Sequence, residues 1–175
     1  GEDERVLRAT QVVLEEKLAR PILVGRPSVV EARIKRFGLS IRAGQDFDLI
    51  NPEDDPRYRS YVQTYIDVAG RRGVTPEAAR TVVRTNATVI AALAVMRGEA
   101  DAMICGVEGR YMSHLRHVRE IIGFLPGVSD YAALALMITS KGSYFIADTQ
   151  VRPNPSAEEL AEVASLAAVH VQRFN

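Results

Sequence analysis

This 175-residue chain has one cysteine, no tryptophan and no excess of either charge. Its single cysteine, Cys105, cannot form an intrachain disulfide, which is typical of proteins from a reducing, cytoplasmic compartment. The 22 lysine and arginine residues balance 22 aspartate and glutamate residues. This balance creates no overall field that would attract nucleic acid or an anionic membrane, so any preference for an anion must be local.

Long apolar runs are also absent. The longest, Tyr131 to Thr139, is far too short to cross a bilayer, so we expect neither a membrane span nor a signal peptide. The hydrophobic share of 47% and the charged share of 25% are ordinary for a globular domain. Without an initiator methionine, and with a helix predicted right up to the last residues, the chain is expected to be a piece of a longer polypeptide.

The sequence contains no G-x-G-x-x-G, Walker or G-x-S-x-G motif, and no catalytic set of nucleophile, base and acid can be assembled. Cys105 lies in an apolar segment without a nearby base, so we interpret it as a buried small hydrophobe. His114 and His117 have the i,i+3 spacing of metal ligands. A metal site needs a third ligand, however, and His170 is the only other histidine. We therefore expect no metal site and no catalytic residue here.

Helical and strand patterns alternate along the chain, which predicts an α/β fold with a largely parallel sheet. Helices are expected at Glu4–Leu18, Pro27–Phe37, Arg57–Arg72, from Thr75 to about Met96, and from Ser156 onward; strands are expected at Pro21–Gly25, Phe47–Ile50 and Ala102–Cys105. Two further strands, Ala132–Thr139 and Ser143–Ala147, predict an antiparallel hairpin. The expected helix caps are Asp3, Thr75 and Ser156, the last in a capping box with Glu159.

The stretch from Met103 to Ile122 carries most of the chemical information. An apolar run ends at Gly106 and Gly109, and a helix containing several arginines follows. A strand, a glycine turn and a helix start together present free backbone N–H groups and the positive end of a helix dipole. Arg110 in the loop and Arg116 one turn into the helix add bidentate partners for a phosphate or carboxylate. The pattern predicts an anion-binding site for a phosphorylated or acyl-phosphate-like group.

A simpler interpretation of the same helix remains open. In this interpretation the arginines form only a solvated face, with an i,i+4 pair between Arg116 and Glu120 that contributes a few tenths of a kcal/mol. In either case Leu115, Val118 and Ile122 share one face and are expected to be buried.

The two histidines of this helix carry separate expectations. His114 is expected to be partly buried and hydrogen-bonded. His117 in its charged form would assist anion binding.

Asp148 ends a predicted strand, which is where ligands bind in open α/β sheets. Its carboxylate can hold a ligand, orient an arginine or cap a turn. The turn is the favoured interpretation, because aspartate readily accepts hydrogen bonds from nearby backbone N–H groups.

Three strings resemble phosphate acetyl/butyryltransferases: G-E-D-E-R-V-L-R-A, A-D-A-M-I-C-G and A-D-T-Q-V-R-P-N-P-S-A-E-E-L-A-E. The string G-R-Y-M-S-H-L-R-H-V-R-E-I-I-G, Gly109 to Gly123, is more similar still to the phosphotransacetylase-like C-terminal domain of bacterial NADP-dependent malic enzymes. The resemblance covers all 175 residues. It implies a three-layer α/β/α fold of the isocitrate/isopropylmalate dehydrogenase type, with a mostly parallel sheet and one antiparallel hairpin.

The resemblance also implies a site. Active acyltransferases carry a small, hydroxyl-rich loop of the type S-G-A-x-H-S-T before a substrate-binding arginine, and Arg116 falls on that arginine. Gly109-Arg110-Tyr111 departs from the small hydroxyls, which puts transferase activity in doubt. The expected ligand-binding residues are Gly106, Arg110, Tyr111, Ser113, Arg116 and Asp148.

The function implied by the resemblance is a regulatory and oligomerisation domain that binds acetyl-CoA as effector. The parent would convert malate to pyruvate by oxidative decarboxylation, using NADP and Mg or Mn in an N-terminal malic enzyme domain of the same chain. One alternative is an active phosphate acetyltransferase, which makes acetyl phosphate and CoA with the thioester near Ser113. Another is a pure interaction module. We expect a cytoplasmic homo-oligomer without nucleic-acid or membrane partners.

The resemblance further implies that residues 1–175 are a fragment of the domain. Its first strand and a later segment that carries the remaining catalytic residues lie outside this chain. A lobe boundary is expected near 123–130.

Overall fold

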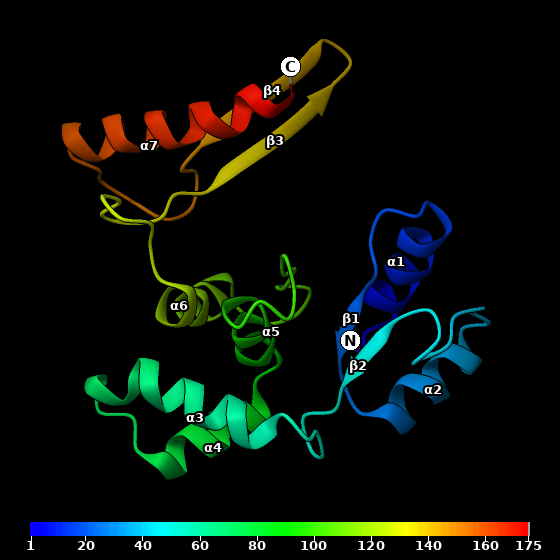
Figure 1. The fold of residues 1–175 in the computed structure, drawn as a ribbon. Helices are drawn as coiled ribbons and strands as arrows, with labels where there is room; N and C mark the ends of the chain where they lie inside the picture. Colours follow the sequence, from blue (N-terminus) through cyan, green and yellow to red (C-terminus); the bar gives the residue numbers. More distant parts are fainter. Residues whose placement is uncertain (175) are drawn as a thin grey trace. The chain divides into compact units, whose positions relative to one another are not determined.

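The computed structural model describes residues 1–174; Asn175, the end of the expected 1–175 domain, lies outside them. The chain forms two compact units, Gly1–Gly123 and a second that begins at Phe124. Figure 1 shows the order of the elements along the chain. Within the part of the chain that is described, no helix is both long enough and apolar enough to cross a membrane.

The first unit is built around a short parallel sheet. Strand β1, Ile22–Val24, pairs with β2, Asp48–Ile50, and helix α2, Pro27–Arg36, connects them. Side chains alternate across the sheet: Leu23 packs into one hydrophobic cluster, whereas Ile22 and Val24 pack against another. The sheet therefore has a helical layer on each face, as in the expected three-layer α/β/α fold.

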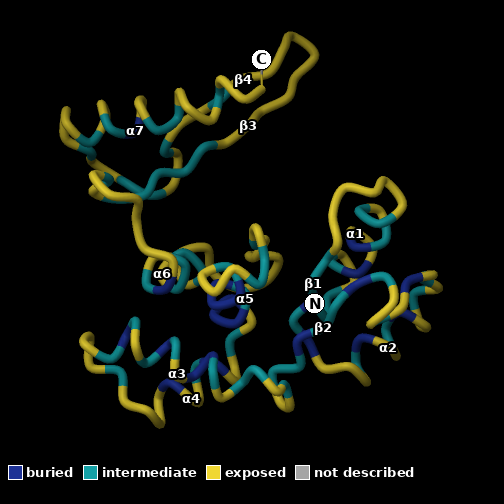
Figure 2. The backbone as a smooth tube through the Cα atoms, viewed as in Figure 1, coloured by how far each residue is buried: buried dark blue, intermediate teal, exposed yellow. Residues whose placement is uncertain are grey.

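One helical layer consists of α1, Glu4–Glu15, and α2. Its cluster contains six buried side chains: Leu7, Leu23, Val30, Ile34, Ile41 and Phe47. The other layer contains α3, Tyr58–Ala69, a short 3₁₀ turn η1, Gly70–Arg72, and helices α4, Pro76–Thr85, α5, Ala87–Met96, and α6, Tyr111–Ile122. Figure 2 shows α5 as the most continuously buried of these helices, and six of its ten residues are buried.

The single helix expected from Thr75 to about Met96 is wrong, because the chain breaks at Asn86. This residue has an extended backbone, with φ −126° and ψ 102°, and its side-chain oxygen accepts hydrogen bonds from the backbone N–H groups of Thr88 and Val89. Asparagine competes with the helix for these groups and so begins a new helix. The amphipathic α4 therefore ends where the almost wholly apolar α5 starts.

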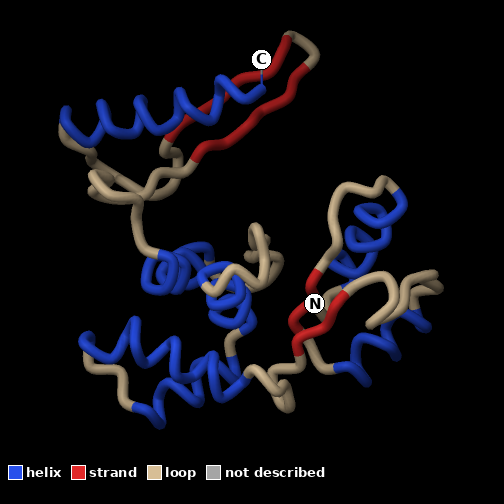
Figure 3. The backbone as a smooth tube through the Cα atoms, in the orientation of Figure 1, coloured by secondary structure: helices blue, strands red, loops and turns tan. Residues whose placement is uncertain are grey.

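The strand expected at Ala102–Cys105 is also wrong, since this segment has irregular backbone (Figure 3). A strand needs a neighbour to satisfy its N–H and C=O groups. Among the described strands, β1 pairs with β2 and β3 pairs with β4, so none borders this segment. Met103 still packs against the core, whereas the Ile104 side chain is 97% exposed.

The second unit holds the antiparallel hairpin predicted from the sequence. Strand β3, Leu134–Thr139, pairs with β4, Gly142–Ala147, and Leu134 lies opposite Ala147. Helix α7, Ala157–Val171, follows with the complete capping box of Ser156 and Glu159, and a short 3₁₀ turn η2, Gln172–Phe174, ends it. The rings of Phe145 and Phe174 lie 5.2 Å apart, which ties the end of the helix to the hairpin.

Candidate functional site

The loop before α6 forms the glycine turn predicted from the sequence. Gly106 and Gly109 have φ angles of 100° and 93°, a left-handed region that favours glycine. A Cβ atom at Gly109 would lie 2.9 Å from Nε2 of His114, so this position also lacks room for a side chain. The backbone therefore turns sharply into the helix, as the predicted anion site requires.

The N-terminus of α6 lacks a side-chain cap. Its N-cap residue is Arg110, which makes no capping hydrogen bond, whereas Asp3, Thr75, Asn86 and Ser156 cap the helices that follow them. The first N–H groups of a helix have no partner inside it. An arginine cannot accept hydrogen bonds from them, so this end of the helix is open to an anion.

Of the expected site residues, five lie on this loop and the first turns of α6: Gly106, Arg110, Tyr111, Ser113 and Arg116. All five are exposed. The guanidinium groups of Arg110 and Arg116 make no hydrogen bond or ion pair with the residues that the structure describes. Glu120 does not pair with Arg116, because its carboxylate accepts a hydrogen bond from the Tyr65 hydroxyl at 3.0 Å. The i,i+4 ion pair of the simpler interpretation is therefore not formed, whereas the exposure of Arg110 and Arg116 agrees with its solvated face.

The buried face of α6 differs from the predicted one. Ile121 is buried, whereas Leu115 and Val118 are half-buried and the Ile122 side chain is 43% exposed. Two histidines of the helix form hydrogen bonds with the start of α5, His114 with Thr88 and His117 with Asn86. Figure 1 shows α5 and α6 side by side.

His114 is partly buried and hydrogen-bonded, as expected. Its Nε2 lies 2.6 Å from the carbonyl oxygen of Glu108, which can only accept, so Nε2 carries a proton. In the neutral ring Nδ1 then accepts a hydrogen bond from the Thr88 hydroxyl at 2.8 Å. His114 thereby joins the glycine loop to the first turn of α5.

His117 contradicts the expectation of a charged ring. Burial, followed by the nearby Arg116 guanidinium, lowers its pKa below the ordinary value. Its Nε2 lies 3.0 Å from Nδ2 of Asn86. The Asn86 amide oxygen already accepts from backbone N–H groups, so its nitrogen is the donor and His117 Nε2 must be unprotonated. His117 therefore positions α6, and its lowered pKa disfavours the charged form that was expected to assist anion binding.

One neighbour of the loop, Arg5, could not be anticipated from the sequence. The Arg5 guanidinium donates a hydrogen bond to the carbonyl oxygen of Val107 at 3.3 Å and is paired with Asp3. Cys105 was expected to be buried in a strand but is exposed. Its thiol is still shielded enough for burial to raise its pKa, which lowers the thiolate fraction and hence its nucleophilicity.

Asp148 belongs to the second unit. Its φ angle is 52°, and its Oδ1 accepts a hydrogen bond from the backbone N–H of Val151 at 3.3 Å. This is the turn geometry that the sequence favoured. Oδ2 is buried and has no hydrogen-bond partner among the described residues. Its participation in ligand binding with the other five residues stays a prediction.

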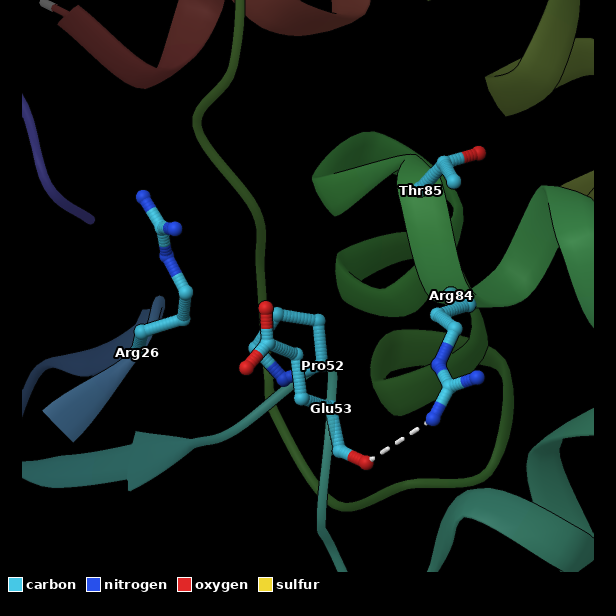
Figure 4. Close-up of a pocket in the computed structure, with 5 residues that line it drawn as sticks. All are labelled: Arg26, Pro52, Glu53, Arg84 and Thr85. Carbon is cyan, nitrogen blue, oxygen red and sulfur yellow. Dashed lines mark hydrogen bonds between the residues drawn. The ribbon is translucent and has the colours of Figure 1, made fainter.

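A pocket of about 550 Å³ opens at the carboxyl ends of β1 and β2. Five residues line it: Arg26, Pro52, Glu53, Arg84 and Thr85 (Figure 4). The expectation that ligands bind at strand carboxyl ends was applied to Asp148, but it also concerns the residues that follow the first two predicted strands. The same rule would have found Arg26 and Glu53. In the part of the chain that is described, no three His, Cys, Asp or Glu side chains gather to hold a metal ion.

Comparison with known proteins gives the family. The family described as Phosphate acetyl/butaryl transferase matches residues 1–175. The chain is 60% identical over 174 residues to an NAD-dependent malic enzyme of Rhizobium meliloti and 48% identical to an NADP-dependent malic enzyme of Escherichia coli. These matches cover 99% of this chain but 23% of each relative. The chain thus spans about a quarter of the length of these relatives.

Known acyltransferases are more distant relatives. A phosphate acetyltransferase of Nitratidesulfovibrio vulgaris is 32% identical over 174 residues, which are 99% of this chain and 24% of that protein. The solved structure of the EutD phosphotransacetylase from Staphylococcus aureus aligns with a TM-score of 0.81 and 27% identity. That alignment covers 93% of this chain and 48% of the EutD chain. The chain belongs to the phosphate acetyl/butyryl transferase family.

Proposed function

We propose that this chain is the regulatory domain of an NAD(P)-dependent malic enzyme and that it binds acetyl-CoA as effector. The parent protein would convert malate to pyruvate by oxidative decarboxylation, in a part outside these residues, and would be a cytoplasmic homo-oligomer. Two relatives with the name malic enzyme, at 60% and 48% identity, support the identity of the parent.

One observation supports the proposal of a ligand site: Arg110 and Arg116 stand at an uncapped helix N-terminus and form no ion pair with any residue from 1 to 174. The two guanidinium groups and the positive N-terminal end of the helix dipole repel one another. An anion bound between them would relieve that repulsion. A charge-assisted hydrogen bond to a phosphate or carboxylate contributes about 1.5–3 kcal/mol. Acetyl-CoA carries phosphates and a thioester carbonyl, both of which can accept from these donors.

Binding without turnover is favoured by the loop itself. Gly109, Arg110 and Tyr111 stand where the family resemblance expects small hydroxyl side chains. The Tyr111 side chain is 46% exposed and has a bulk that serine or threonine lacks. A binding site is thereby kept while the small hydroxyl groups of the acyltransferase loop are absent.

The redox chemistry of the parent is assigned to residues outside this chain. The described residues offer no group of three potential metal ligands, and the sequence has no dinucleotide fingerprint. Mg or Mn and NAD(P) therefore do not fit the described residues. Acetyl-CoA would regulate the malate-converting site of the parent because it binds two states of the enzyme with unequal affinity.

The test is calorimetric titration of acetyl-CoA into the full-length enzyme, beside malate kinetics with and without the effector. We expect saturable binding, a change in the kinetics, and no acetyl phosphate on addition of inorganic phosphate. Kinetics that respond equally in an enzyme shortened by this domain would refute the regulatory role.

An active phosphate acetyltransferase is the second candidate, and the 32% identical phosphate acetyltransferase favours it. Arg116 would then bind inorganic phosphate, and the thioester would lie near Ser113. Release of free CoA from acetyl-CoA that depends on added phosphate would establish this activity. Release at the background rate would remove it.

Assembly is the third element of the proposal. The hairpin carries exposed apolar side chains on both strands, and two of them, Leu136 at 42% and Ile138 at 77%, lie on the same face. Contiguous exposed apolar surface marks interaction sites. Sedimentation of the full-length enzyme, wild type beside an Ile138→Lys variant, measures the contribution of the hairpin: we expect the variant to dissociate at higher protein concentration. If every CoA ester failed to bind while the oligomer persisted, assembly would be the only role left.

A further inference from the structure

The pocket of Figure 4 lies where a parallel β-α-β unit places its ligand. Strand β1 leads through Gly25 and Arg26 into α2, and β2 leads into Pro52 and Glu53. The end of α4 closes the other side with Arg84 and Thr85. Crevices outside the carboxyl ends of parallel strands are the usual ligand sites of such sheets, and a volume of about 550 Å³ is in the range of small-molecule pockets.

In β-α-β units that bind nucleotides, a phosphate usually lies at the start of the helix. Here the Glu2 carboxylate already occupies that position. Its Oε1 accepts from the backbone N–H and from Nε of Arg26, both at 2.9 Å, and its Oε2 accepts from Nη2 at 2.9 Å. The Arg26 hydrogen bonds hold the pKa of Glu2 at about 2, so this internal anion is charged at neutral pH. A phosphate cannot take the same place without displacing it.

Arg84 is the cation of the pocket that remains without a carboxylate partner among the described residues. Its Nη2 donates only to the backbone carbonyl oxygen of Glu53, at 3.4 Å, and its guanidinium lies 6.0 Å from the centre of the Tyr58 ring. Figure 4 shows Arg26 and Arg84 on opposite sides of Pro52 and Glu53. The lining therefore combines a positive group, an acceptor and an apolar proline surface.

We propose that this pocket binds the adenosine 3′,5′-bisphosphate end of acetyl-CoA, with a phosphate on Arg84. The carboxylate of Glu53 accepts a hydrogen bond from a ribose hydroxyl or from the adenine amino group, and Pro52 packs against the base. This proposal rests on the proposed function, because it names the part of acetyl-CoA that a second subsite holds.

The chain connects this pocket directly with the loop before α6. Thr85 lines the pocket, and the next residue, Asn86, caps α5 and donates a hydrogen bond to His117 of α6. Thr88, one turn further, contacts His114, which in turn holds the glycine loop. Arg84 and Arg116 thus lie on helices joined through the start of α5. The nucleotide end of the ligand occupies the pocket, and its pantetheine arm leads the thioester toward Arg110 and Arg116.

The probe is adenosine 3′,5′-bisphosphate, titrated into the full-length enzyme. We expect Arg84→Ala to weaken its binding about 10- to 100-fold, because one charge-assisted phosphate contact is lost. Arg80→Ala is the matched control: it removes an exposed arginine one turn earlier on α4 whose side chain forms no hydrogen bond or ion pair with the described residues. Arg116→Ala should leave the binding of this probe unchanged but weaken acetyl-CoA.

Two further probes separate the possible results. Acetyl-pantetheine lacks the nucleotide and should bind equally to wild type and to Arg84→Ala. Adenosine 2′,5′-bisphosphate carries the phosphate pattern of NADP and tests whether the pocket prefers that nucleotide. Acetyl-CoA that binds equally well to wild type and Arg84→Ala would overturn the pocket assignment and leave the proposed function intact. A third result is also informative: adenosine 3′,5′-bisphosphate binds through Arg84, but acetyl-CoA does not change the malate kinetics of the enzyme. This result would support the pocket assignment and refute the proposed regulatory function. A clear preference for the 2′,5′ isomer would overturn the assignment to CoA.

Discussion

Nδ2 of Asn86 lies 3.0 Å from Nε2 of His117 and joins the cap of one helix to the middle of another. The same asparagine accepts hydrogen bonds from the N–H groups of Thr88 and Val89 through its side-chain oxygen. One amide thus fixes the start of α5 and the orientation of α6, on which the arginines of the candidate site stand.

Replacement of Asn86 separates these two roles. Asn86→Ala removes both the cap and the contact with His117, and we expect a loss of about 1–2 kcal/mol in the free energy of unfolding. Asn86→Asp keeps a capping oxygen but cannot donate to His117 Nε2, so it should lose less stability while still disturbing α6. Urea denaturation measures the first effect and acetyl-CoA affinity the second. Equal stability of the alanine variant and wild type would disprove the capping role.

His117 predicts a pH dependence with a defined sign. Its pKa in the folded protein is lowered from 6.5, so between pH 6.5 and the folded pKa the unfolded chain binds more protons than the folded one. Stability is therefore greatest above pH 6.5 and falls as the pH decreases through that window. Glu120, Tyr65, Arg116 and His114 are the charged and titratable groups around the ring.

Urea denaturation at pH 7.5 and pH 5.5 measures this effect. His117→Gln retains an acceptor for Asn86 without titrating, so it should lose less stability than wild type between these two pH values. The carboxylates titrate in both proteins and cancel in the difference. An identical loss in wild type and variant would show that His117 does not titrate in this range.

Arg116→Ala tests the anion site directly. Loss of a charge-assisted hydrogen bond should weaken acetyl-CoA binding by about 1.5–3 kcal/mol. Arg59→Ala removes an exposed arginine from α3 and serves as the control for a simple change of net charge. Calorimetry on the full-length enzyme gives both dissociation constants. An unchanged value for Arg116→Ala would exclude this residue from the site.

Leu93→Ala probes the core beneath the site. Leu93 on α5 is fully buried, so truncation leaves a cavity and should cost about 2–5 kcal/mol. Met96 lies on the same helix with 47% of its side chain exposed, and Met96→Ala should cost far less. Chemical denaturation compares the two variants. Similar losses for both would show that α5 is not held by its buried face.

The positions of the site residues could be predicted from the sequence only in part. The glycine loop, Arg110 and Arg116 were recognised because they lie within a dozen consecutive residues. Arg26, Glu53 and Arg84 were not, because the pocket brings together residues that are up to 59 positions apart in the sequence. Cys105 was placed in a buried strand because its apolar neighbours resemble one, yet the described residues supply no strand beside it.

The sequence by itself determined what depends on a few neighbouring residues. Asp3, Thr75 and Ser156 cap helices, and the hairpin turns at Ser140–Gly142, because these hydrogen bonds connect residues within about four positions. Tertiary structure decided the rest. Whether 102–105 becomes a strand, which face of α6 is buried and whether His117 is charged all depend on distant partners and on their burial, and these come into place only when the chain folds.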